Sequence, residues 1–111
     1  MALSIKRLVP GSILTGSVAT YYTCPANKYA ILKSLTVANS TASAVSVSLY
    51  LVPGGATASA AYLIRPPRLV DVNESYTCPE AVNQVLEGGG TIQAVGSGLT
   101  LIVSGAEGVN A

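Results

Sequence analysis

The stretch Ala44-Val45-Ser46-Val47-Ser48-Leu49-Tyr50-Leu51-Val52 alternates with a period of two. Side chains two residues apart lie on the same face of a strand, so the alternation places Val45, Val47, Leu49 and Leu51 together. One face of this strand is therefore expected to be buried, and the other is expected to expose its serine side chains to solvent. The stretch predicts a strand with one side against a hydrophobic core.

The preceding segment, residues 29–38, also has the composition of a strand. Its apolar residues fall on both faces, so the register is ambiguous although the strand is not. Residues 39–43 connect the two segments and are small and polar, as expected for a hairpin loop. We therefore expect residues 29–38 and 44–52 to pair as an antiparallel hairpin.

Further short strands are expected along the chain, separated by segments rich in Gly, Pro, Asn and Asp. They span residues 17–23, 60–65, 68–72, 82–86, 91–95 and 99–104. No window has the 3.6-residue period of a helix. The pattern predicts an all-β fold, a single antiparallel β-sandwich of jelly-roll type with about seven or eight short strands.

The length of 111 residues predicts one compact domain. We expect residues 13–111 to form the sandwich and residues 1–12 to form an N-terminal arm, because the first twelve residues hold few apolar side chains in register. Pro10 and Gly11 interrupt the apolar run that a signal peptide needs.

The composition is apolar and poor in charge. Half of the residues are hydrophobic and 10% are charged, which is typical of proteins packed against others, yet no apolar run is long enough to span a membrane. A net charge of +1 gives no field that attracts nucleic acid. Neither a membrane nor nucleic acid is expected as a partner.

Catalytic chemistry is not indicated. The sequence has no histidine, which excludes the usual general base and the histidine-dependent triads. The two cysteines cannot complete a zinc site, and the spacing of the five carboxylates does not bring any pair together. We predict a protein that is not an enzyme, with no catalytic residues, metal site, cofactor or small-molecule substrate.

The tetrapeptide Tyr-Thr-Cys-Pro occurs twice, at residues 22–25 and 76–79, and contains both cysteines. Proline cannot donate a backbone hydrogen bond, so each copy is interpreted as the end of a strand. A disulfide between Cys24 and Cys78 is one alternative. The other, which we favour, is two free thiols that fill space as small apolar side chains.

Two segments are candidate interfaces. The arm contains Ile5, Lys6, Arg7 and Leu8, which suit contact with a neighbouring subunit. Arg65 and Arg68 flank two prolines in an expected stiff turn, where two guanidinium groups suit an acidic group on a partner. The alternative for the second segment is a solvated loop.

Several segments resemble a pattern found in small virion proteins of tailed bacteriophages. Residues 22–28 (YTCPANK), 31–39 and 47–55 (VSLYLVPGG) are similar to a "YTVPAGK"-like turn, a strand ending in Asn, and an "LYLVPAGG"-like strand and turn. Residues 86–94 and 101–107 are similar to that family's closing hairpin.

The resemblance implies a non-enzymatic β-sandwich building block. It favours a capsid decoration or cement protein that binds the major capsid protein or other virion proteins as a homo-oligomer, with a trimer preferred. The chain would then be located in the virion and assembled in the cytoplasm of the bacterial host. Two alternatives stay open, a neck, tail or fibre-adaptor protein and, in another class, a carbohydrate-binding module.

Overall fold

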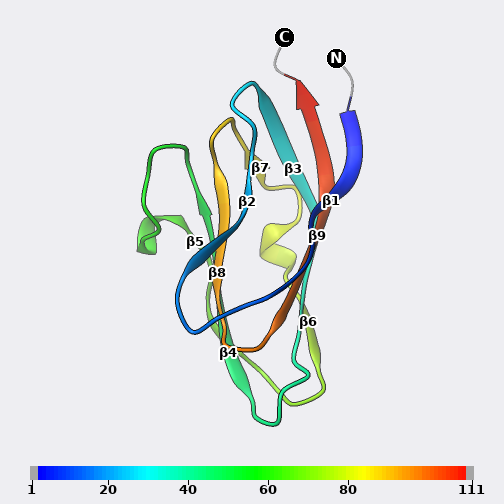
Figure 1. Ribbon diagram of the computed structural model, residues 1–111, viewed down its shortest axis with the longest axis vertical. Coiled ribbons are helices and arrows are strands. Elements are labelled where there is room, and N and C mark those ends of the chain that lie inside the picture. The colour runs from blue at the N-terminus through cyan, green and yellow to red at the C-terminus, as the bar shows by residue number, and fades with distance from the viewer. Residues whose placement is uncertain (1–2, 110–111) are drawn as a thin grey trace.

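The computed structural model describes residues 3–109, which form nine strands and two short 3-10 helices (Figure 1). The strands are β1 (Leu3–Ile13), β2 (Ala19–Thr23), β3 (Lys28–Ala38), β4 (Val45–Val52), β5 (Leu63–Val70), β6 (Ser75–Thr77), β7 (Val85–Leu86), β8 (Thr91–Val95) and β9 (Thr100–Val109), and the helices are η1 (Ala60–Tyr62) and η2 (Pro79–Ala81). In this part of the chain no helix is long and apolar enough to cross a membrane.

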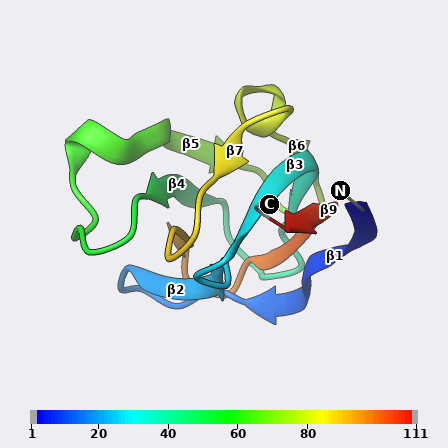
Figure 2. The same ribbon diagram turned by 90° about the horizontal axis from the view of Figure 1, so that it is seen from above.

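The strands form two antiparallel sheets. The five-stranded sheet has the order β1-β9-β3-β6, with β7 also paired to β3, and the four-stranded sheet has the order β2-β8-β4-β5. Seen end on, the sheets form two layers with β1 and β5 on opposite sides of the sandwich (Figure 2). The predicted all-β antiparallel sandwich is confirmed.

The topology is that of a jelly roll. Of the connections between successive strands, those from β1 to β2, β2 to β3, β3 to β4, β5 to β6, β7 to β8 and β8 to β9 all pass from one sheet to the other. The segments β6 and β7 together act as one interrupted strand beside β3, because η2 lies between them and packs on β3. Eight strand positions in two four-membered layers are typical of a jelly roll.

Two expected hairpins are wrong. β3 and β4 are not paired, because the six-residue connection between them crosses the sandwich. The segments expected as the closing hairpin, residues 86–94 and 101–107, lie mainly in β8 and β9, which also belong to different sheets. The alternation of apolar and polar residues along a strand predicts which face is buried, but it does not predict which strand lies beside it. The predicted buried face of β4 is confirmed at Val47 and Leu49, whereas Val45 and Leu51 are only half-buried, and Ser48 and Val52 of the other face are buried as well.

The expected turn at Pro66-Pro67 is also wrong, since both residues lie within β5. β5 is an edge strand of its sheet, where proline is tolerated because one side of the strand does not need backbone donors. Residues 65–68 of β5 lie opposite residues 47–49 of β4, so a bulge accommodates one extra residue.

The N-terminal segment is a strand of the sandwich rather than a separate arm. Residues 3–13 pair along β9, with two shifts of register that break the alternation of this strand. Leu8 and Val9 are consecutive yet both buried, because the first shift falls between Arg7 and Val9. This bulge hides the strand from a search for period two. Met1 and Ala2 lie outside the described residues.

Two expected strands are shorter in the structure. Residues 60–62 form η1 before β5 begins, and within residues 82–86 only Val85 and Leu86 pair with β3. The ambiguous register of β3 is resolved by a shift between Leu32 and Ser34, which lets Leu32 and Leu35 both face the core.

The core lies between the sheets and consists mainly of Leu, Val, Ile and Ala. Its buried members are Leu8, Val9, Leu14, Cys24, Ala30, Leu32, Leu35, Val37, Val47, Leu49, Val70, Cys78, Ala81, Leu86, Ile92, Ala94, Leu99, Leu101 and Val103. Gly105 permits a close approach within this layer, because a Cβ at this position would lie 2.1 Å from the carbonyl oxygen of Ile31.

Candidate functional site

A buried charged cluster joins the two sheets near the end of β9. Glu107 is only 6% exposed, and its backbone lies opposite Ala30, whose side chain is in the core. The hydroxyl of Tyr22, from β2 in the opposite sheet, donates a hydrogen bond to Oε2 of Glu107. A carboxylate in this position needs such partners, because an unpaired buried charge is strongly unfavourable.

Two lysines complete the cluster. The Nζ atom of Lys6 lies 3.3 Å from Oε1 of Glu107, and that of Lys28 lies 3.9 Å from the same oxygen. The hydrogen bond from Tyr22, followed by the lysines, holds the pKa of Glu107 below its usual value, although burial acts in the opposite direction. Burial, reinforced by Glu107, raises the pKa of the Tyr22 hydroxyl. These shifts keep the carboxylate charged and the phenol neutral, which suits a structural contact.

Both cysteines are buried in the core, and neither is in a disulfide. Cys24 Sγ contacts the carbonyl oxygens of Lys28 at 3.6 Å and Leu86 at 3.8 Å, and burial raises the pKa of its thiol. The structure therefore has no Cys24–Cys78 disulfide. Each cysteine directly follows a strand, β2 or β6, as the repeated tetrapeptide predicts.

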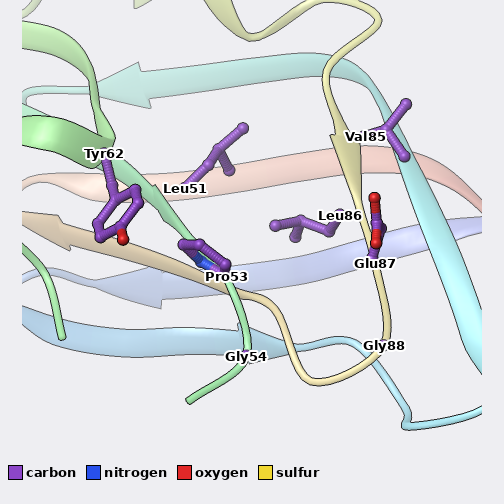
Figure 3. Close-up of a pocket in the computed structure, with 8 residues that line it drawn as sticks. All are labelled: Leu51, Pro53, Gly54, Tyr62, Val85, Leu86, Glu87 and Gly88. Atoms are coloured by element: carbon purple, nitrogen blue, oxygen red, sulfur yellow. The ribbon is translucent and has the colours of Figure 1, made fainter. Parts of the chain in front are cut away.

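A half-open pocket of about 410 Å³ lies between the end of β4, η1 and the turn from β7 to β8 (Figure 3). It is lined by Leu51, Pro53, Gly54, Tyr62, Val85, Leu86, Glu87 and Gly88. Tyr62 lies at one end, Val85 and Glu87 lie at the other, and the side chains between them are apolar. Because the lining includes a carboxylate and no Lys or Arg, the pocket suits an apolar or cationic group better than an anion.

An apolar row crosses the outer face of the five-stranded sheet. Ile5 in β1 pairs with Ala106 in β9, Ala106 pairs with Ile31 in β3, and Ile31 pairs with Val85 in β7. Directly opposed residues share a face, and this face is the outer one, because the next residue of β7, Leu86, points into the core. Ile5 is 91% exposed and Val85 is 54% exposed, whereas Ile31 between them is half-buried and Ala106 is only 5% exposed.

The structure separates the predicted interface residues. Ile5, Lys6, Arg7 and Leu8 lie in β1, whereas Arg65 and Arg68 lie in β5 on the far side of the sandwich (Figure 2). Leu8 is buried in the core, so its side chain is not available to a partner. Lys6 contacts Glu107.

The guanidinium of Arg68 lies over the ring of Tyr76, 4.2 Å from its centroid, which is the geometry of a cation–π contact. An interface role for the exposed members of this set stays a prediction.

No sequence pattern indicates the Glu107 cluster, because its members are scattered along the chain. The pocket was also missed, since its two ends come from η1 and the turn after β7. Among the side chains that the structure describes, no three of His, Cys, Asp or Glu lie close enough together to hold a metal ion.

The fold is shared with chains of solved virus structures. A chain in the structure of the infectious bursal disease virus (IBDV) Gx strain superposes with a TM-score of 0.60 and 11% identity, covering 99% of this chain and 33% of that chain. A chain in the crystal structure of the T13 IBDV viral particle superposes with a TM-score of 0.57 and 8% identity, covering 96% of this chain and 30% of that chain. At these identities the likeness shows the fold alone.

The protein thus spans about a third of the length of each of those chains. No protein-family model matches the sequence, and no curated protein matches it.

Proposed function

We propose that this protein is a non-enzymatic structural component of a virus particle. The observation that carries the proposal is its jelly-roll topology over nearly the whole chain, a fold that it shares with chains of virus particles. Because a fold alone does not specify a function, the surface supplies the second argument. The protein is poor in charge and exposes large apolar side chains such as Ile5, Leu69 and Val85, as a subunit of an assembly does.

In its finer form, the proposal is a capsid decoration or cement protein of a tailed bacteriophage. The sequence segments that resemble small virion proteins of those phages support this form. The protein would bind the outer capsid as a homo-oligomer, with a trimer preferred, and many weak contacts would combine through avidity. The two thiols, neither of which is in a disulfide, support assembly in a reducing host cytoplasm.

Mass measurement and capsid binding test this proposal. Native mass spectrometry at micromolar concentration is expected to detect an oligomer, and the purified protein is expected to sediment together with capsids that lack it. A protein that stays monomeric and does not bind capsids contradicts the decoration role.

The alternative location is the neck, tail or fibre adaptor, which needs the same kind of sandwich. Imaging of virus particles with the protein labelled distinguishes the two locations. Label spread over the capsid supports decoration, and label confined to the neck or tail supports the alternative.

A further inference from the structure

The apolar row on the outer face connects two complementary features on opposite sides of the molecule. It begins at Ile5, which projects from the edge strand β1 and is the most exposed large apolar side chain of the described residues. It ends at Val85, which lines the pocket beside Glu87. Ile5 and Val85 lie on the first and the last of four adjacent strands, β1, β9, β3 and β7. Adjacent strands are about 4.8 Å apart, so the two residues lie roughly 14 Å apart across the sheet, at the same position along the strand direction.

The pocket has the chemistry to receive such a side chain. Its floor between Tyr62 and Val85 is made by Leu51, Pro53 and Leu86, so a buried aliphatic group would exchange water for apolar contacts (Figure 3). Ile5 itself is 91% exposed, which leaves nearly all of its surface available for burial.

Charges flank both features and are opposite in sign. Arg7 follows Ile5 by two residues and shares its outer face, since both pair regularly with β9. Glu87 follows Val85 by two residues at the rim of the pocket. Both side chains are exposed, and neither forms an ion pair with any side chain that the structure describes.

We propose that Ile5 of one copy of this protein inserts into the pocket of a second copy, with Arg7 of the first copy facing Glu87 of the second. The contact uses two different surfaces, so it is head-to-tail, and repeating it closes a ring or extends a lattice. This inference rests on the proposed role as a self-assembling virion protein and identifies the surfaces that its copies use.

Oligomer mass as a function of concentration, measured by native mass spectrometry and sedimentation velocity, tests the contact. Ile5→Asp and Val85→Asp are each expected to weaken association about tenfold or more, because each places a charge in the apolar contact. Ile13→Asp is the matched control, since Ile13 is also an exposed residue of β1 but pairs with Thr100, far from the row. It is expected to leave association unchanged, and thermal unfolding confirms that each variant is folded.

Mixing the two variants tests the head-to-tail geometry. Ile5→Asp keeps an intact pocket and Val85→Asp keeps an intact Ile5, so an equimolar mixture is expected to form a dimer of one copy of each that does not grow further. Arg7→Glu and Glu87→Arg are each expected to weaken association, and the double variant that carries both is expected to restore it.

If Ile5→Asp and Val85→Asp form oligomers of the same mass as the wild type at the same concentrations, the proposed contact is wrong, but a structural role of the protein is not affected. A wild-type protein that is monomeric at all concentrations overturns the contact, while binding to capsids then decides the proposed function separately. A glycan-array signal that Tyr62→Ala removes, with the oligomer mass unchanged in Val85→Asp, overturns the contact and assigns the pocket to a sugar.

Discussion

The hydroxyl of Tyr22 in β2 donates a hydrogen bond to the carboxylate of Glu107 in β9, and this contact joins the two sheets of the jelly roll. The tyrosine removes part of the cost of burying the carboxylate, and the lysines supply opposite charge from the solvent side. The cluster is therefore expected to act on stability rather than on a reaction.

Tyr22→Phe is expected to lower the free energy of unfolding by about 2 kcal/mol, because it removes a hydrogen bond to a charged and buried acceptor. Lys6→Ala is the matched control, expected to lose less than about 1 kcal/mol because Lys6 is 48% exposed and its ion pair is screened by water. Urea denaturation of the three proteins measures the difference. A larger loss in Lys6→Ala than in Tyr22→Phe contradicts this ranking.

Stability is expected to depend on Glu107 at acidic pH. The folded protein lowers the pKa of this carboxyl, so its contribution is fully present above the unfolded value of about 4.3 and is lost as the pH falls through the lower folded value. Glu107→Gln cannot titrate and should show a flatter profile of unfolding free energy below pH 5. Parallel profiles for the wild type and Glu107→Gln would rule out this linkage.

The strand pattern of the sequence predicts the sandwich well, because burial of one face imposes a period of two, as in β8. Pairing was not predictable in the same way. The connections after β3 and β8 cross between the sheets, and no local pattern distinguishes such a crossover from a hairpin. β1 was missed because its bulge places Leu8 and Val9 on the same side.

The candidate site was harder to predict than the fold. Tyr22 lies 85 residues from Glu107 in sequence and Lys6 lies 101 residues from it, so their meeting depends on the jelly-roll topology. Ile5 and Arg7 were identified as interface candidates from their position near the N-terminus. The pocket proposed to receive them depends on η1, which has no distinctive sequence, and on the turn after β7, whose glycines predict a turn but not a pocket.

Asn39 is expected to stabilise the crossover from β3 to β4. It is buried, its Nδ2 donates to the carbonyl oxygens of Ser43 and Val70 at 2.9 and 2.8 Å, and its Oδ1 accepts from Thr41. Asn39→Ala is expected to cost about 2–4 kcal/mol of unfolding free energy, since several buried groups lose their partners.

Thermal or urea unfolding measures this effect, and Asn27→Ala at an exposed position is the control. A cost below about 0.5 kcal/mol, the usual range for surface substitutions, would show that Asn39 does not hold the crossover.

The thiols are expected to be protected in the native protein, because Cys24 and Cys78 are 1% and 0% exposed. Titration with a thiol reagent should detect almost no rapid reaction under native conditions. In denaturant without reductant it should detect both thiols, because neither is in a disulfide. Fewer than two reactive thiols in freshly prepared, unfolded protein would indicate a bridge.

We propose above that this protein is a structural component of a virus particle. Cryo-electron microscopy of purified particles from the virus that encodes it is the decisive experiment. We expect symmetry-related copies of a jelly-roll density into which residues 3–109 fit, with neighbouring copies in contact. Particles that lack this density, and in which mass spectrometry detects none of the protein, would show that the protein is not a virion component.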